Sequence, residues 1–471
     1  MALEWELRPD QIEDLAKLMQ NPRWIMGGEP GTGKTPTICV MQRYLWDHHQ
    51  TGTIWAMPLS LLKKNREEAL RFGGWDPADV VIVDGTPAQV QIQMLKPAKV
   101  FLMGFARFAK ILKEGKFPER FRAMHTDEHH KGFSGHDSSR TGALYEFMKQ
   151  QGKWFVPATG TIINGKLDTA YPAIQIIEPR YYGSFDGFKN RHHQLDMWTG
   201  KRIGFQDHAH LQEILQAHGS FSKWKDIFGN EQKVIQVELV EMEAEQKVLY
   251  KKFEKDALLE LEQFFIDGAM PGVAFHRARQ IMEIPNHFPD LRFPNSKATV
   301  DIIPGRRPGK LERLELHLTD HFTNGTPFVI FAPLIKQQLQ IFELCESLGI
   351  KTGLLVGASP PRQRAQTDEA FRAGVLQGIV ASDQVADAGF NWQFWGPNKQ
   401  EVGHCIFAAL NYVDTTFFQA YRRFLRETRL TPLRITVMKY VDSLDFRIAE
   451  INNRKSYDAK LIDPHRELLR L

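Results

Sequence analysis

The chain has 471 residues, of which 42% are hydrophobic and 25% are charged, and its formal net charge is +4. This length is too great for one compact core, so we expect two or three domains, and the composition is ordinary for a globular protein. The small positive charge is compatible with a nucleic-acid partner but does not indicate one, because binding needs a local basic patch.

The N-terminus and the cysteines bear on where the protein works. The N-terminus carries no basic stretch followed by an apolar one, and no apolar run approaches the ~20 residues that span a bilayer. The three cysteines, Cys39, Cys345 and Cys405, are scattered in apolar runs, which is typical of buried free thiols in a reducing compartment. We therefore expect a cytoplasmic protein with no membrane partner.

Short apolar runs alternate with helical stretches over residues 1–180. The expected helices include Leu61–Phe72, and the expected strands are Trp24–Met26, Thr53–Met57, Val80–Val83, Val100–Met103 and Trp154–Val156. Strands that alternate with helices are typical of a parallel sheet covered by helices. The sequence therefore predicts an α/β lobe in this part of the chain.

A phosphate-binding loop follows the first expected strand. Residues 28–35 fit the pattern GxxxxGK[ST], and a helix-compatible stretch comes after them. Glycines let such a loop wrap a phosphate while the new helix directs N–H groups at the anion. Lys34 is expected at the β- and γ-phosphate oxygens and Thr35 at Mg²⁺. The remaining nucleotide contacts are expected from Gly28, Gly31, Thr32 and Gly33. This loop alone does not separate kinases, GTPases, transporters and helicases.

An acidic pair lies 93 residues beyond Lys34, in the run Asp127-Glu128-His129-His130. Hydrolysis of ATP needs one carboxylate on Mg²⁺ and another near the attacking water, and adjacent acids at the end of a strand can divide these roles. We assign Asp127 to the metal and Glu128 to the water. The preceding run, Arg122–Thr126, is a poor apolar strand.

The same segment admits another interpretation, as a transition-metal site. Its candidate ligands are His125, Asp127, Glu128, His129, His130 and His136, side chains that suit such metals. The phosphate-binding loop favours the nucleotide interpretation, because it already gives the two acids a role.

Residues 181–304 differ in character and are predicted to be a helical insertion and linker. A long helix is expected over Glu241–Phe265, and five prolines in residues 284–308 are typical of a linker. The aromatic residues of the insertion are expected to be core residues more often than stacking platforms; they include Trp198, Phe221, Trp224 and Phe228.

Alternation resumes over residues 305–440, which predicts a second α/β lobe. The expected strands are Phe328–Phe331, Thr352–Val356, Gly378–Ala381, His404–Ala408 and Arg434–Val437. Residues 441–471 are expected to be a C-terminal segment that braces the first lobe, with a helix from about Asp442 on.

The order of these motifs resembles superfamily 2 helicases, and most closely the Swi/Snf-type DNA translocases with a DExH box. Leu7–Gln11 resembles the motif whose glutamine reads adenine, here Gln11, and Ile54–Leu62 resembles motif Ia. Ala158–Asn164 resembles motif III, which couples the ATP site to the nucleic-acid track, here through Thr159 and Thr161. Ile162 replaces the usual proline.

The second block continues the resemblance. Phe328–Phe331 resembles motif IV, and Ser382–Asn391 resembles motif V, with Gly389 at a nucleotide-binding position. Gln419–Arg426 resembles motif VI, with Gln419 in a coupling role and Arg423 and Arg426 at its arginine positions. An arginine that reaches the γ-phosphate from the second lobe stabilises charge as that group leaves. Arg422 stands where the family has a glycine. Which of the two arginines, Arg423 or Arg426, is this arginine finger stays open.

The resemblance implies two RecA-like parallel-sheet lobes, an ATP and Mg²⁺ site in the cleft between them, and a DNA track. Track contacts of this kind go mostly to phosphates, and the candidates are Ser60, Lys63, Lys64, Arg107 and Ser382. The chain resembles the minimal motors of bacterial and phage members, with specificity supplied by a protein partner. The favoured track is duplex DNA.

Three other functions are considered beside this one. The first is an RNA-directed helicase of the same superfamily. The second is a non-motor nucleic-acid-binding protein that uses ATP as a switch. The third is a metal-dependent nuclease built on the histidine-rich segment. Strand separation or translocation only, the direction of travel and the oligomeric state are not readable from the sequence.

Overall fold

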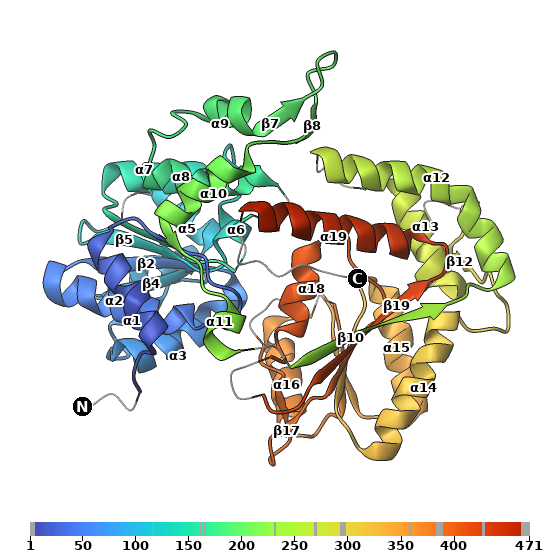
Figure 1. The fold of residues 1–471 in the computed structure, drawn as a ribbon. Helices are drawn as coiled ribbons and strands as arrows, with labels where there is room; N and C mark the ends of the chain where they lie inside the picture. The colour runs from blue at the N-terminus through green and yellow to red at the C-terminus, as the bar shows by residue number, and fades with distance from the viewer. Residues whose placement is uncertain are drawn as a thin grey trace. The chain divides into compact units, whose positions relative to one another are not determined.

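The structure is a computed structural model, and it describes most of the chain in ten stretches: residues 5–115, 117–160, 162–163, 166–229, 232–267, 271–292, 298–357, 359–382, 390–425 and 429–462. These residues form two compact units, whose elements are labelled in Figure 1. The first holds the described residues of 1–195, 204–230 and 458–467. The second holds those of 196–203 and 231–457.

A five-stranded parallel sheet forms the centre of the first unit. Its strands stand in the order β3 (Val80–Ile82), β4 (Val100–Gly104), β2 (Gly52–Met57), β5 (Phe121–Thr126) and β6 (Trp154–Pro157). Every residue of β2, β4 and β6 is buried, as expected for a parallel sheet with both faces covered. The α/β lobe predicted here is confirmed.

Strand β1 (Ile25–Met26) extends this sheet beyond β6 through single bridges, Arg23 to Phe155 and Met26 to Ala158. On its other side it pairs in parallel with β9 (Gly219–Ser220), nearly two hundred residues further along the chain. The strand that carries the phosphate-binding loop is therefore held between two neighbours.

The helices of the first unit follow and connect these strands (Figure 1). Leu62, Asn65 and Ala69 bury one face of α3, at the spacing of a helix packed on a sheet. The helical elements are α1 (Pro9–Gln20), α2 (Lys34–His49), η1 (Leu59–Leu61), α3 (Leu62–Gly73), α4 (Pro87–Met94), α5 (Phe105–Glu114), α6 (His129–Gly132), α7 (Ser139–Gln150), η2 (Leu167–Ala170), α8 (Tyr171–Ile177), α9 (Phe185–His192), α10 (His208–Ala217) and α11 (Trp224–Phe228).

The second unit is built on a six-stranded parallel sheet. Its order is β10 (Lys233–Val240), β19 (Leu433–Tyr440), β18 (His404–Phe407), β13 (Phe328–Phe331), β15 (Gly378–Ala381) and β14 (Thr352–Leu355). The longer helical elements are α12 (Ala244–Asp267), α13 (Val273–Glu283), α14 (Gly309–Asn324), α15 (Ile335–Ser347), α16 (Pro361–Arg372), α18 (Asp414–Tyr421) and α19 (Leu444–Ile462). The prediction of two parallel-sheet lobes is confirmed.

The segment between the two sheets is not only helical. It carries β7 (His193–Leu195), β8 (Arg202–Phe205) and β9, and β10 is an edge strand of the second sheet, paired along its whole length with β19. Apolar and polar side chains largely alternate in the run Val234–Val240, and this two-residue period is typical of a β-strand. The proline-rich stretch expected as a linker contains η3 (Pro285–His287) and a short antiparallel pair, β11 (Phe288–Pro289) with β12 (Thr299–Val300). A second such pair joins β16 (Phe394–Trp395) and β17 (Gln400–Glu401).

All three cysteines are buried and free, as the sequence predicts. In the part of the chain that the structure describes, no helix combines the length and apolar character needed to cross a membrane.

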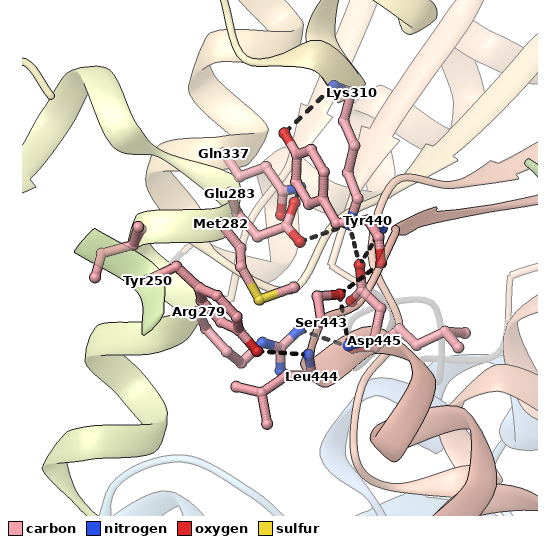
Figure 2. Close-up of polar contacts among 12 residues, drawn as sticks. Tyr250, Arg279, Met282, Glu283, Lys310, Gln337, Tyr440, Ser443, Leu444 and Asp445 are labelled. Carbon is pink, nitrogen blue, oxygen red and sulfur yellow. Dashed lines mark hydrogen bonds and ion pairs between the residues drawn. The ribbon is translucent and has the colours of Figure 1, made fainter. Parts of the chain in front are cut away.

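A buried polar network joins four helices to the second sheet (Figure 2). The Lys310 ammonium of α14 contacts the carboxylates of Glu283 on α13 and Asp445 on α19, each at 2.7 Å. The Gln337 side chain donates to Glu283 at 2.6 Å, and the Tyr440 amide of β19 donates to Asp445 at 2.9 Å. The side chains of the ion triad are at most 4% exposed.

One buried lysine therefore forms ion pairs with two buried carboxylates. Burial lowers the pKa of Lys310, but the two carboxylates outweigh it and leave that pKa above its usual value. Burial raises the pKa of Glu283 to about 7 against the opposing effect of Lys310. Removing the cation would leave buried negative charge without compensation.

We expect Lys310→Met to lower the free energy of unfolding of the second unit by about 3–5 kcal/mol, because it leaves two buried carboxylates without a counter-charge. Denaturant titration of the wild-type and variant chains measures this loss. Lys251→Met is the matched control, because Lys251 pairs with Glu254 on the surface, where such pairs contribute under ~1 kcal/mol. Equal stability of the two variants would contradict the role given to Lys310.

Candidate nucleotide and nucleic-acid site

The phosphate-binding loop has the backbone that its glycines permit. Gly31 and Gly33 have φ values of 88° and 85°, in the left-handed region that side chains other than glycine disfavour. Helix α2 starts at Lys34, directly after Gly33, so its first N–H groups border the loop. The Lys34 ammonium donates to the carbonyl oxygens of Gly28 at 2.5 Å and Glu29 at 3.1 Å. A phosphate is a stronger acceptor than these carbonyls, so the lysine is already placed where phosphate oxygens would replace them.

Gln11, which the resemblance assigns to reading adenine, lies against this loop. It is 5% exposed, and its side-chain amide donates to the Gly33 carbonyl at 2.8 Å while its side-chain oxygen accepts from the Arg8 amide. The Arg8 guanidinium donates to the Thr32 carbonyl at 2.6 Å and also pairs with Asp10. The start of α1 is therefore bonded to the loop at two points.

Asp127 lies at the end of β5 and belongs to a group of oxygen-bearing side chains. The Asn65 amide of α3 donates to the Asp127 carboxylate at 2.9 Å. Burial raises the pKa of Asp127 and the Glu128 carboxylate raises it further, while Asn65 and the Lys34 ammonium lower it. Asp127 and Lys34 are therefore close enough to interact electrostatically.

Glu68, one turn beyond Asn65 on α3, lies near the two residues assigned to the metal. Burial raises its pKa and the Asp127 carboxylate raises it further, while the Lys64 ammonium and the Thr35 side chain lower it. Carboxylate and hydroxyl oxygens are the ligands that Mg²⁺ prefers, so this group fits a magnesium ion. Sequence reasoning missed Asn65 and Glu68, although a polar residue on the buried face of α3 is a signal that could have indicated the first.

Glu128 has a left-handed backbone, with φ 50° and ψ 51°, which is uncommon for a residue other than glycine and is often found at functional sites. Its amide donates to the Asp127 carboxylate at 3.0 Å. Its carboxylate lies 3.6 Å from Nδ1 of His130, and that same nitrogen is 2.7 Å from the hydroxyl of Thr159. His130 therefore lies between the proposed water-activating acid and the segment that resembles motif III, and it is hydrogen-bonded to the latter.

Residues 219–228 lie along the phosphate-binding loop and form hydrogen bonds with it. The Glu29 amide donates to the Ser222 carbonyl, and the Glu29 carboxylate accepts from the Trp224 amide. A Cβ added to Gly27 would lie 2.2 Å from the Phe221 ring, so only glycine fits there. Gly27 lies one residue before the GxxxxGK[ST] pattern, so that pattern does not indicate it.

The expectation that the aromatic residues of the insertion are core residues holds for some of them and fails for one. Trp224 is 5% exposed, as expected for a core residue, and Phe221 packs against the hydrophobic cluster of the first unit. The Phe228 ring lies 5.0 Å from the Arg8 guanidinium. The expectation is wrong for Trp198, which is 95% exposed, because it lies in the turn between two short strands where no other element covers it.

The histidines near Asp127 are engaged in separate contacts. His125 is fully buried within β5, and burial lowers its pKa to about 3. His129 hydrogen-bonds Thr126 at 3.0 Å, and the His136 ring stacks on Phe185 at 3.5 Å between ring centroids. Within the described ranges, no three His, Cys, Asp or Glu side chains are grouped to hold a metal ion. These contacts do not favour the transition-metal interpretation.

Four of the five candidate track residues lie in the first unit. Ser60 and Lys63 are exposed, and Lys64 is exposed beside Glu68 at 3.7 Å. Arg107 donates to the Gly85 carbonyl at 2.7 Å, so its guanidinium is partly committed to the protein. The fifth candidate, Ser382, lies in the second unit and is 8% exposed.

The motif VI residues lie in and after α18. Gln419 is 4% exposed, and Arg423 follows the end of the helix, where its carbonyl accepts from the Trp392 amide. Arg422 is 4% exposed, so it is part of the interior of the second unit. Three further candidates, Thr161, Gly389 and Arg426, lie outside the described residues.

Comparison with known proteins supports the fold. No family model and no curated protein matches the chain. The helicase domain of Hef from Pyrococcus furiosus is similar in structure with a TM-score of 0.54, at 14% sequence identity, over 94% of this chain and 97% of that chain. The SWI2/SNF2 ATPase core of Sulfolobus solfataricus, solved with double-stranded DNA, covers 99% of this chain and 98% of that chain, with a TM-score of 0.43 and 17% identity. The chain thus shares its fold with the Hef helicase domain.

Proposed function

We propose that this protein is an ATP-hydrolysing motor that translocates on DNA, with duplex DNA as its track. The observation that carries the proposal is the position of His130, whose Nδ1 is 2.7 Å from the Thr159 hydroxyl and 3.6 Å from the Glu128 carboxylate. This histidine lies between the acid proposed to activate water and the segment proposed to sense the track. A protein that only binds ATP has no need for such an arrangement.

The first unit supplies the groups that bind and cleave ATP. Lys34 binds the β- and γ-phosphates, and Gln11 with the loop glycines holds the remainder of the nucleotide. Thr35 and Asp127 hold Mg²⁺, with Glu68 and Asn65 around them, and the ion neutralises charge on the phosphates. Glu128 orients and deprotonates the attacking water.

The second unit supplies charge stabilisation. Arg423 or Arg426 reaches the γ-phosphate when the two lobes close on the nucleotide, so hydrolysis depends on closure. The two structural units take the roles of the two lobes: the described residues of 1–195 and 204–230 belong to the first, and those of 196–203 and 231–457 to the second. The DNA is held by phosphate contacts from both lobes, and a protein partner selects the site of action.

An RNA-directed helicase is the second candidate, because phosphate contacts of this kind do not distinguish the two nucleic acids. ATP hydrolysis with duplex DNA, single-stranded DNA, RNA and no nucleic acid separates the possibilities. Strongest stimulation by RNA would assign the chain to RNA. Equal turnover with and without every nucleic acid would favour the non-motor ATP switch, and cleavage of DNA with Mn²⁺ but without ATP would favour the nuclease.

We expect Lys34→Ala and Glu128→Gln to lower DNA-stimulated ATP turnover by about 10²–10⁴-fold, because each removes a group that acts on the reacting phosphate or water. Steady-state ATPase assays at saturating DNA measure this loss. Glu67→Gln is the control, since Glu67 is exposed on α3, and it should turn over ATP normally. Normal turnover by Glu128→Gln would show that Glu128 is not the base.

Asn65→Leu tests the positioning of Asp127. Loss of the amide donor frees the carboxylate that holds Mg²⁺, and loss of such a partner weakens metal affinity or activity about 10–100-fold. We expect the variant to need more Mg²⁺ for half-maximal hydrolysis, which a magnesium titration of the ATPase rate measures. An unchanged magnesium requirement would mean that Asn65 has only a structural role.

Arg423→Ala and Arg426→Ala test the second unit's contribution. Removing the arginine finger should lower ATP turnover by about 10³–10⁵-fold while ATP affinity changes little, because the arginine acts on the leaving phosphate. Comparing the two variants identifies the finger, and Arg362→Ala, an exposed arginine of α16, is the control. Loss of ATP binding with no separate loss of turnover would remove the finger role from both.

A further inference from the structure

Strand β10 is a long edge strand of the second sheet. It stands at the end of the strand order, beside β19 (Figure 1), and runs for eight residues. The strand at the opposite edge, β14, has four residues, three of which are buried. Among the described residues, no strand pairs with the outer side of β10. A long edge of this kind is a template for a further strand, and proteins usually shorten or interrupt such edges.

The backbone groups of alternate residues point outward from this edge. The Leu433 amide of β19 donates to the Gln232 carbonyl, and the Val441 amide donates to the Val240 carbonyl. The even-numbered residues of β10 therefore direct their backbone groups at β19. Because these directions alternate along a strand, the amides and carbonyls of residues 235, 237 and 239 point away from β19.

Apolar side chains accompany these outward backbone groups. Val234 is 49% exposed, Val237 is 42% exposed and Leu239 is 56% exposed. Neither proline nor lysine interrupts the run Val234–Val240, in which Glu238 is the single charged residue. The Glu238 carboxylate is bound by two side chains of α14, Arg313 and His317, so its charge is directed toward its own unit. This edge therefore has little that would prevent pairing with a further strand.

We propose that two copies of this chain associate through β10, with the two strands antiparallel about a two-fold axis at Val237. A two-fold axis brings the same surface of both copies together, so the two valines face each other. Ile235 of each copy then faces Leu239 of the other. Residues 235, 237 and 239 form the hydrogen-bonded pairs of an antiparallel ladder, and the two six-stranded sheets become continuous. Association of this kind is independent of the proposed ATP hydrolysis.

The register about Val237 opposes no charges of like sign over residues 233–241. The remaining cross-strand pairs are Val234 with Val240, Gln236 with Glu238, and Lys233 with Glu241. An axis one residue earlier would place Val234 against Glu238, and an axis one residue later would place the two Glu238 side chains against each other. Like charges directly opposite are destabilising. A strand that matches itself in this way favours a second copy over a strand of another protein.

The test is the association of the full-length chain, measured by sedimentation equilibrium. One strand is a small contact beside the ~800 Å² that each partner contributes to a stable complex. We therefore expect the wild-type chain to dimerise with a dissociation constant below about 100 μM, which a series from about 1 to about 200 μM covers.

Charge substitutions at the axis test the register. We expect Val237→Lys and Val237→Glu each to remain monomeric, because each variant places two like charges against each other. An equimolar mixture of the two variants should form dimers, because the facing charges then attract. Val248→Lys is the matched control, at a 65% exposed valine of α12, and it should associate as the wild type does. Circular dichroism verifies that each variant is folded.

Hydrogen exchange in the wild-type chain gives a second measurement that needs no variant. Exchange of the Ile235, Val237 and Leu239 amides should slow as the protein concentration rises, because these amides become bonded in the dimer. A wild-type chain that stays monomeric over the whole series would overturn the proposal. Wild-type dimers would also overturn it if Val237→Lys associates equally well, or if the mixture of the two charged variants does not associate.

Discussion

The parallel order of the first sheet is the constraint on which the candidate site depends. Strands β1, β5 and β6 end at the same edge, which places the phosphate-binding loop, the Asp127–Glu128 pair and Thr159 side by side. Backbone bonds fix this register: the Thr159 amide donates to the Met26 carbonyl and the Ala158 amide to the Thr126 carbonyl. The side chains therefore approach because their strands pair, and the 2.7 Å contact of His130 with Thr159 is a consequence of that pairing.

Both units contain polar connections that tie their elements together. In the first, Arg8, Gln11 and Glu29 bond the phosphate-binding loop to α1 and to residues 219–228. In the second, Lys310 joins three helices to the sheet. Polar networks of this kind have one well-satisfied arrangement, so under the proposed function we expect each unit to move as a single piece.

The fold was predictable where local pattern decides it, and not where distant partners do. The strand Phe328–Phe331 has the bounds that its apolar run predicts. β5 is weak in the sequence because His125 and Thr126 are polar, yet both are buried between β2 and β6. β9 has two small residues, and only pairing with β1 makes it a strand. For the same reason Glu68 was missed, because its role follows from where α3 packs, whereas Asn65 is a polar residue on the buried face of α3 and had a local signal.

The central claim is that groups of both units act on one nucleotide. The most direct measurement is a crystal structure of the chain with Mg²⁺, ADP and a phosphate transition-state mimic, in the presence of duplex DNA. We predict that Lys34 and either Arg423 or Arg426 contact the same mimic, with Asp127 on the metal and Glu128 at the apical water. A mimic bound by the first unit alone, with both arginines far from it, would contradict the account.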